Sequence, residues 1–263
     1  MLGAIIGDIV GSDYEFGSPK TKRFTLFTPF CRPTDDTVMT IAVGCACVEG
    51  NLRDEKNFKK VLAERMRELG RLYPSAGYGG MFYRWLMSDD MGPYNSYGNG
   101  SAMRVSPVAY AADTLPEVER LAKWSAEVTH DHPEGIRGAQ AIASATFLAR
   151  TGRSKEEIRA YIEQKYYYLN FTLDEIRPSY EFDVTRQGSV PQAIECFLEA
   201  EDYEDAIRNA VSLGGDGDTI AAMAGAIAEA YFGIPEELQE EGLSRLDETL
   251  LDYYLGYSDE LYG

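Results

Sequence analysis

Two short stretches of the sequence each place two aspartates and a threonine where an apolar segment begins. These stretches are TDDT at 34–37 and GGDGDT at 214–219. A polar residue at such a point usually caps a helix, because one side-chain oxygen satisfies a free backbone N–H group and suits the helix dipole. Capping needs a single oxygen, whereas each stretch offers several. The six side chains are Thr34, Asp35, Asp36, Asp216, Asp218 and Thr219.

In the segment 34–49, apolar residues occupy nearly every position from Val38 to Val48, and 218–232 looks the same, which is typical of helices buried on all sides. Alanines and glycines in 218–232 would let another helix approach closely. If the two helices pack with their first turns adjacent, four carboxylates converge and repel one another unless they are protonated or neutralised by cations. Because every candidate ligand is an oxygen, the pattern favours Mg²⁺, Mn²⁺ or Ca²⁺ over zinc or copper. For either stretch alone, simple capping remains the alternative.

Helical periodicity extends over most of the remaining chain, and no run of alternating apolar and polar residues indicates strands. Ser154 and Glu157 have the spacing of a capping box, Asp131 is expected to cap a helix, and Gly70 is expected to end one. The predicted helices are 54–69, 115–128, 131–150, 154–168, 202–213 and 235–251. The irregular stretches, expected to form the walls of a site, are 12–34, 88–101 and 170–190. The sequence therefore predicts one all-α domain over residues 1–263.

The chain has a formal net charge of −18, which disfavours nucleic acid and anionic membranes as partners. No run approaches the roughly 18 apolar residues of a membrane span. The apolar N-terminus lacks the basic start of a signal peptide and is interrupted by Asp8. Cys45 and Cys47 lie two apart in an expected helix, point in different directions and are expected as small buried apolar residues. We therefore expect a reduced, cytoplasmic protein.

Five stretches together resemble the ADP-ribosylglycohydrolase family, also called ADP-ribosyl-acceptor hydrolases, which includes the dinitrogenase-reductase-activating glycohydrolases. They are GAIIGDIVGSDYE (3–15), TDDT (34–37), SYGNGSAMRVSP (96–107), THDHPEG (129–135) and GGDGDT (214–219). The two acidic stretches with GNGSAMR between them form a specific signature, whereas any one alone would be weak. The resemblance implies an all-helical fold with a dinuclear metal cleft. The chain is short for the family, so we expect reduced loops and an open cleft.

The resemblance also implies roles for individual residues. Thr34, Asp35 and Asp36 match one half of a site for two Mg²⁺ or Mn²⁺ ions, and Asp216, Asp218 and Thr219 match the other half. Glu15 matches a glutamate near the scissile ribose, and we expect it to transfer a proton or position water, with Asp36 or Asp218 sharing that work. The residues expected to hold the diphosphate and adenosine end of ADP-ribose are Ser96, Tyr97, Gly98, Asn99, Gly100, Ser101 and His132. A helix continuing from GNGS through MRVSPVAYAA would direct its N-terminus at that anion.

The expected activity is hydrolysis of the bond between C1 of the distal ribose of ADP-ribose and an acceptor, releasing ADP-ribose. Arginine on an ADP-ribosylated protein is the first candidate acceptor, and serine, O-acetyl-ADP-ribose or another small ADP-ribose conjugate and a nucleic-acid base remain open. A two-metal nucleotide phosphohydrolase is a further alternative. So is a relative that binds ADP-ribose without turnover. The sequence indicates no oligomeric state.

Overall fold

Helices form all the regular structure that the computed structural model describes, which comprises residues 1–15, 17–181 and 189–262, and no strand occurs there. This confirms the all-α fold class. The first helices are α1 (Leu2–Gly11), α2 (Asp35–Glu49), α3 (Glu55–Leu72), α4 (Gly80–Met87), α5 (Gly100–Met103), the 3₁₀ helix η1 (Ser106–Ala109), α6 (Leu115–Glu127) and α7 (Pro133–Arg150). The others are α8 (Lys155–Lys165), α9 (Leu173–Ile176), α10 (Val190–Leu198), α11 (Tyr203–Leu213), α12 (Gly217–Phe232), α13 (Glu236–Ser244) and α14 (Glu248–Tyr262).

Local capping signals begin several helices where the sequence predicts. The Ser154 side chain accepts from the N–H of Glu157 at 3.3 Å, and the Glu157 carboxylate accepts from the N–H of Ser154 at 2.9 Å, so the capping box of α8 is confirmed. The cap of α7 is His132, whose Nδ1 accepts from the N–H of Glu134 at 3.1 Å. The prediction of Asp131 as that cap is wrong, because its carboxylate instead accepts the N–H of Asn95 at 2.6 Å.

Two predicted helix ends are also wrong, and tertiary packing explains both. Helix α3 continues through Gly70 to Leu72, and a Cβ at Gly70 would lie 2.5 Å from Cδ1 of Leu86. The glycine therefore lets α3 approach α4 and does not end the helix. Segment 235–251 forms two helices, because Asp247 accepts the N–H of Leu250 at 2.9 Å and starts α14 anew.

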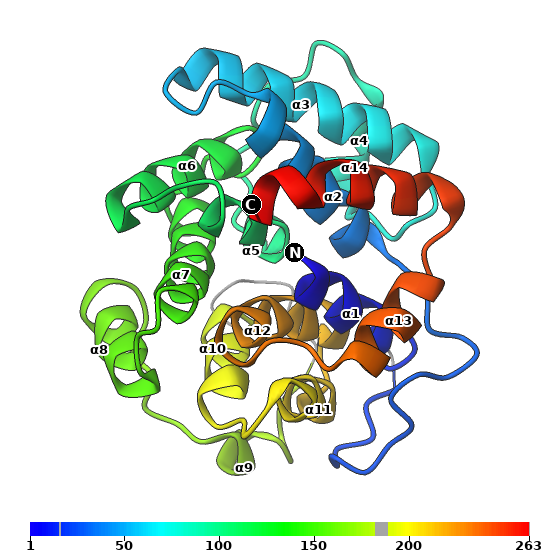
Figure 1. The fold of residues 1–263 in the computed structure, drawn as a ribbon, viewed down its shortest axis with the longest axis vertical. Helices are drawn as coiled ribbons and strands as arrows, with labels where there is room; N and C mark the ends of the chain where they lie inside the picture. The colour runs from blue at the N-terminus through cyan, green and yellow to red at the C-terminus, as the bar shows by residue number, and fades with distance from the viewer. Residues whose placement is uncertain (16, 182–188, 263) are drawn as a thin grey trace.

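Helices α1 and α12 pack with their backbones in near contact, and this pair lies at the centre of the fold (Figure 1). Gly3, Gly7 and Gly11 recur every four residues along α1 and therefore share one face. A Cβ at Gly7 would lie 2.1 Å from the carbonyl oxygen of Ala221, and one at Gly11 would lie 2.3 Å from the Cα of Asp218. The expected close approach of another helix to 218–232 is confirmed, and it brings Asp218 to the C-terminal end of α1.

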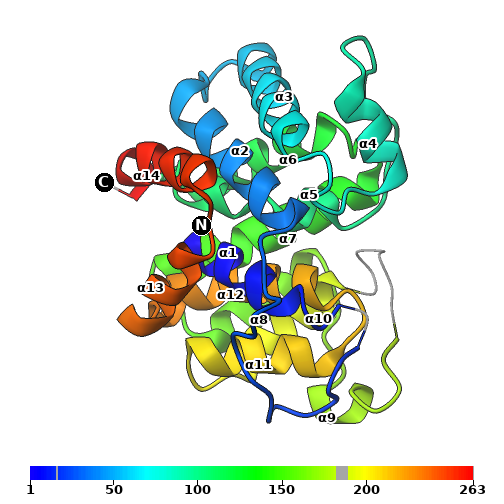
Figure 2. The same ribbon diagram turned by 90° about the vertical axis from the view of Figure 1, so that its right-hand side faces the viewer.

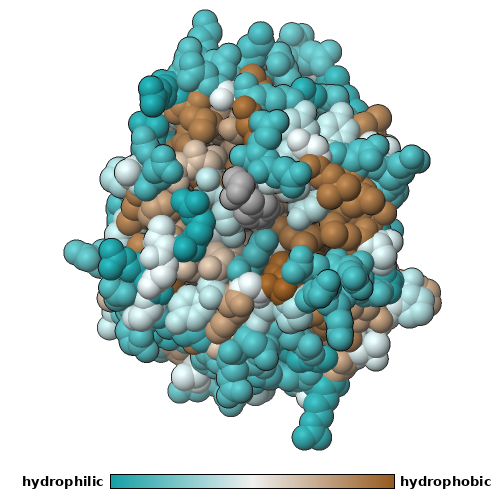
Figure 3. Space-filling model, viewed as in Figure 1, coloured by the Kyte–Doolittle hydropathy of each residue, from teal (hydrophilic) through white to brown (hydrophobic). Residues whose placement is uncertain are grey.

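The remaining helices surround this pair on two sides. Figure 2 shows α2, α3, α4 and α14 toward one end of the molecule and α10, α11 and α13 toward the other. Among the described residues, no helix is both long enough and apolar enough to cross a membrane. On the face shown in Figure 3, hydrophilic residues cover most of the surface and apolar residues form separate patches. The four cysteines are free and buried, and for Cys45 and Cys47 this agrees with their expected role as small buried apolar residues.

Candidate metal centre and cavity

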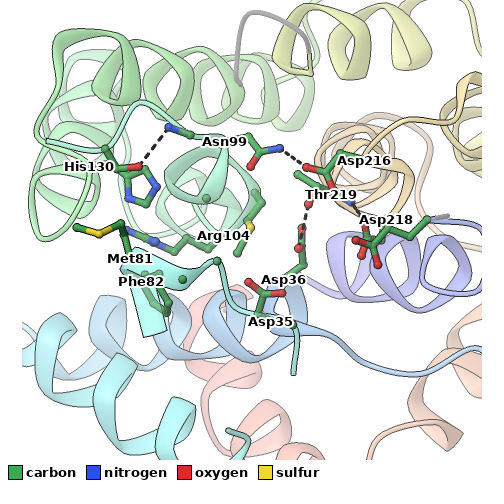
Figure 4. A pocket seen from close by; sticks show the side chains of 18 of the residues that line it. Asp35, Asp36, Met81, Phe82, Asn99, Arg104, His130, Asp216, Asp218 and Thr219 are labelled. Carbon is green, nitrogen blue, oxygen red and sulfur yellow. Dashed lines mark hydrogen bonds between the residues drawn. The ribbon is translucent and has the colours of Figure 1, made fainter. Parts of the chain in front are cut away.

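The N-terminal tips of α2 and α12 meet in space, although the two helices lie far apart in the sequence (Figure 4). The hydroxyl of Thr219, in the first turn of α12, donates to Oδ2 of Asp36, in the first turn of α2, at 3.1 Å. Asp216 stands at the N-cap position of α12, where its carboxylate accepts from the side-chain amide of Asn99 at 2.6 Å. The predicted adjacency of the two helix starts is therefore confirmed.

Carboxylates from four segments converge at this junction. Oxygen atoms of Asp8, Asp36 and Asp218 lie within 4.8 Å of one another, and so do oxygen atoms of Glu15, Asp216 and Asp218. Because Asp218 belongs to both groups, the two groups form one continuous acidic cluster. Such a cluster in a mostly buried position is unstable unless protons or cations compensate the repulsion.

Repulsion and burial raise the pKa of several of these carboxyls. Burial and then the charge of Asp8 raise the pKa of Asp35 to about 8. Burial, with the charges of Asp8 and Asp218, raises the pKa of Asp36 well above its usual range. Burial and then the charge of Asp216 raise the pKa of Asp218 in the same direction, and the same two causes act on Glu15. The cluster therefore has a strong tendency to take up positive charge.

The cluster fits divalent cations by its chemistry. All of its donors are oxygens, which are the ligands of Mg²⁺, Mn²⁺ and Ca²⁺. One oxygen, Oδ1 of Asp36, is buried and has no hydrogen-bond partner among the described residues. A cation would satisfy this oxygen and offset the raised pKa of its neighbours. Three features, the oxygen donors, the unsatisfied atom and the concentration of charge, thus point to the same class of ligand.

Asp8 is the member of the cluster that the sequence analysis did not assign to the site. It is completely buried on α1, and Thr34 donates to it through its N–H at 2.8 Å and its hydroxyl at 2.5 Å. The N–H of Thr37 adds a bond of 3.0 Å, and its hydroxyl donates to the same oxygen. Burial raises the pKa of Asp8, and these four bonds oppose that rise. Asp8 therefore ties the start of α2 to α1.

A cavity of about 390 Å³ opens beside the acidic cluster (Figure 4). Glu15, Asp35, Asp36, Asp218 and Thr219 lie along one part of its wall. The other lining residues come mainly from three places. These are residues 77–82, at the start of α4; residues 94–104, around α5; and His130, between α6 and α7. These residues are Gly77, Gly79, Gly80, Met81, Phe82, Tyr94, Ser96, Gly98, Asn99, Gly100, Met103, Arg104, His130 and Asp216.

Some of the residues predicted to hold the ligand line this cavity and others do not. Ser96, Gly98, Asn99 and Gly100 do, together with all five of the predicted acidic residues. The other three, Tyr97, Ser101 and His132, are not among the lining residues.

The three residues outside the lining have other contacts. Tyr97 is exposed, and its ring packs edge-on against His132, with 5.8 Å between the ring centroids. The Ser101 hydroxyl donates to the carbonyl of Gly135 at 2.9 Å. The histidine in the cavity wall is His130, two residues before the predicted one.

The helix predicted to continue from GNGS does not form. Helix α5 ends at Met103 after four residues, and η1 follows from Ser106. Pro107 has no N–H to donate to residue 103, so it cannot continue an α-helix that starts at Gly100. The lining residues of α4 and the segment before it, from Gly77 to Phe82, had no assigned role in the sequence analysis. The one feature of the sequence that distinguishes this segment is its three glycines, in GYGG at 77–80.

Comparison with known proteins gives a consistent result. The sequence model of the ADP-ribosylglycohydrolase family matches residues 1–262. Human ADP-ribosylhydrolase ARH3 is 30% identical over 332 aligned positions, which cover 94% of this chain and 89% of that protein. ADP-ribosylarginine hydrolase Tri1 of Pseudomonas putida is 26% identical over 267 positions, covering 89% of this chain and 70% of that protein.

A solved structure described as an ADP-ribosylglycohydrolase-related protein complex has a similar fold. Its TM-score is 0.64 at 24% identity, and the match covers 99% of this chain and 96% of that one. The alignment with the human protein is longer than the 263 residues of this chain, so the human protein carries segments that this chain lacks.

Proposed function

The chain belongs to the ADP-ribosylglycohydrolase family, and on this premise we propose that it hydrolyses the C1 glycosidic bond between the distal ribose of ADP-ribose and an acceptor. The products are ADP-ribose and the intact acceptor. The observation that carries the proposal is the convergence on one cavity of carboxylates from the segment after α1, from α2 and from the start of α12. The cavity volume of about 390 Å³ suits a small-molecule ligand.

Two divalent cations, Mg²⁺ or Mn²⁺, are the proposed cofactors. Their proposed ligands are Thr34, Asp35, Asp36, Asp216, Asp218 and Thr219. When bound, such cations hold the ribose hydroxyls and a water, lower the pKa of that water and stabilise the charge that develops as the bond breaks. Cleavage of a glycosidic bond passes through an oxocarbenium-like state, which negative charge in the site also stabilises.

Glu15 is our candidate for proton transfer to or from the reacting water. It lines the cavity and is close to both Asp216 and Asp218. Burial and the charge of Asp216 raise its pKa, which moves the carboxyl toward the range in which it exchanges protons near neutral pH. Asp36 and Asp218 are placed to share this work, since both line the same wall.

The acceptor is proposed by analogy with relatives. One similar protein is named as an ADP-ribosylarginine hydrolase, and this agrees with ADP-ribosylated arginine as the first candidate. The human relative is named only as an ADP-ribosylhydrolase, so serine and O-acetyl-ADP-ribose are the next candidates. Nucleic acid is a poor partner for a chain of charge −18. We place the activity in the reducing cytoplasm, which the four free cysteines support.

A panel of substrates tests this function. ADP-ribosylated arginine peptide, ADP-ribosylated serine peptide and O-acetyl-ADP-ribose are each incubated with the protein in Mg²⁺, in Mn²⁺ and in EDTA. The expected result is metal-dependent release of ADP-ribose from at least one substrate. Release of inorganic phosphate from ADP-ribose would indicate a phosphohydrolase instead. Tight ADP-ribose binding with no release from any substrate would indicate a binding protein.

A further inference from the structure

Arg104 is a completely buried cation in the wall of the cavity, and no salt bridge to it occurs in the described part of the chain. Its Nη2 donates to the hydroxyl of Thr129 at 2.8 Å and more weakly to the carbonyl of Ser125 at 3.4 Å. Its Nε and Nη1 have no hydrogen-bond partner among the residues described. Burial lowers the pKa of Arg104 to about 10, so it stays charged near neutral pH. Its one strong hydrogen bond is therefore the bond to Thr129.

The Thr129 hydroxyl, which contacts Arg104, also contacts the histidine of the cavity wall. The Thr129 hydroxyl lies 2.7 Å from Nδ1 of His130. A guanidinium can only donate, so the hydroxyl oxygen accepts from Arg104. Among the described residues, Nδ1 of His130 is the one acceptor that the hydroxyl hydrogen of Thr129 reaches, so the hydroxyl donates to Nδ1, and Nδ1 is the unprotonated nitrogen of the ring. A neutral imidazole that accepts at Nδ1 carries its hydrogen on Nε2.

Nε2 of His130 faces the loop that runs into α5. A Cβ built at Gly100 would lie 3.1 Å from this nitrogen, and both residues line the cavity. The ring also packs against Tyr94, with 5.9 Å between ring centroids. Burial and then the Arg104 charge lower the pKa of His130 well below its usual range, so the ring is neutral near pH 7.

We infer that Arg104 and Thr129 are positioning residues that hold His130 as a fixed Nε2–H donor, directed at an acceptor oxygen of the ligand beside Gly100. The identity of that oxygen rests on the proposed function, in which it belongs to the diphosphate of ADP-ribose. Because the tautomer is fixed before the ligand binds, the binding free energy does not include the cost of selecting one of the two tautomers of a free imidazole. The arrangement also explains why an arginine with unsatisfied nitrogens is retained in a buried wall, where its charge is otherwise costly.

Nitrogen NMR tests the tautomer directly, because His130 and His132 are the only two histidines in the chain. The protein is labelled with ¹⁵N-histidine, and two-bond proton–nitrogen correlations are recorded with and without ADP-ribose. A His132→Gln variant assigns the two rings. The expected spectrum shows His130 protonated on Nε2 and unprotonated on Nδ1 at neutral pH. A ring protonated on Nδ1, or on both nitrogens, overturns the inference.

Variants at Thr129 test the positioning role. Thr129→Val removes the hydroxyl and is expected to give a mixture of His130 tautomers and to weaken ADP-ribose binding about tenfold. Thr129→Ser keeps a hydroxyl and is expected to restore both the spectrum and the affinity. Unchanged affinity and spectrum in Thr129→Val overturn the inference, and if that variant does not fold, the wild-type spectrum decides. If the wild-type protein does not bind ADP-ribose, the proposed function fails, while the tautomer is still decided by the spectrum.

Discussion

The hydroxyl of Thr219 lies 3.1 Å from Oδ2 of Asp36, although 183 residues separate the two in the chain. This bond joins the first turn of α12 to the first turn of α2. The two acidic stretches are therefore in direct contact, and a shift of one helix start would break this bond or move the other. A change in one stretch is expected to affect both halves of the proposed cation site.

Asp218→Asn tests the proposed cation site. The substitution keeps the size of the side chain but removes the charge of Asp218, the residue that belongs to both groups of carboxylates in the acidic cluster. We expect loss of tight Mn²⁺ binding in calorimetry and a fall in ADP-ribose release of at least about a hundredfold, as is typical when a group that stabilises developing charge is removed. Asp252→Asn, at an exposed position on α14, is the matched control and should behave as wild type. Full activity in Asp218→Asn would rule out the assigned site.

Asp8→Asn tests the residue that ties α1 to α2. An amide nitrogen cannot accept a hydrogen bond, so some of the N–H and hydroxyl groups of Thr34 and Thr37 lose their acceptor. We expect roughly 2 kcal/mol lower stability in denaturant unfolding and weaker Mn²⁺ binding, because Thr34 is no longer held in place.

Thr37→Val is the comparison for Asp8→Asn. It removes one donor to Asp8 but leaves both bonds from Thr34, so it should lower stability while changing Mn²⁺ affinity much less. Equal effects of the two variants on Mn²⁺ affinity would argue against a specific role of Asp8 in orienting Thr34.

The acidic helix starts could be predicted from sequence because their signal is local. Asp35, Asp36 and Asp218 are close to a threonine and immediately precede or begin an apolar run. Asp8 carries no such signal, because it stands alone in an apolar helix and its partners lie 26 and 29 residues further along. A different feature of the sequence could have identified Asp8. An aspartate within an otherwise apolar, buried helix needs hydrogen-bond donors or cations to compensate its charge.

The choice between the two histidines could not be made from sequence. Residues 130 and 132 flank one position in a turn between α6 and α7, and the direction of each ring depends on how that turn folds. The Thr129 hydroxyl holds His130 in the cavity wall, whereas His132 is engaged as the cap of α7. The break between α13 and α14 is a similar case, because the cap at Asp247 lies inside a run that is periodic throughout.

Gly7→Ala tests the close packing of α1 against α12. The added Cβ would lie 2.1 Å from a backbone oxygen, which cannot rotate away as a side chain can. We expect α1 and α12 to move apart, with a loss of stability of about 1–3 kcal/mol and weaker Mn²⁺ binding. Gly256→Ala, on α14, meets nothing within 4 Å and should leave stability unchanged or slightly raised, because alanine favours helix. Equal stability of the two variants would contradict the packing argument.

The stability of the metal-free protein should fall as pH rises. The pKa of Asp35 is about 8 in the folded protein, and those of Asp36 and Asp218 are also raised, whereas an aspartate in an unfolded chain has a pKa of about 4. Between these values the folded state binds more protons than the unfolded state, so each such carboxyl lowers stability by up to about 1.4 kcal/mol per pH unit.

Thermal unfolding in EDTA and in saturating Mg²⁺, from pH 5.5 to 8.5, measures this effect. The decline should be clear in EDTA and much smaller with Mg²⁺, because bound cations replace the protons. A metal-free protein that gains stability across this range would show that the carboxyls are not protonated at neutral pH.

Glu15→Gln separates proton transfer from cation binding. Glutamine keeps the shape of the side chain but cannot exchange a proton, so we expect kcat to fall on the order of a hundredfold or more. Because the pKa of Glu15 is raised by burial and by Asp216, the wild-type rate should decline on the acidic side as this carboxyl becomes protonated, and the variant should lose that dependence. Mn²⁺ affinity should change less than in Asp218→Asn, and Glu237→Gln, at an exposed position on α13, is the control. A variant with the wild-type rate and pH profile would remove Glu15 from the mechanism and leave Asp36 and Asp218 as the remaining candidates for proton transfer.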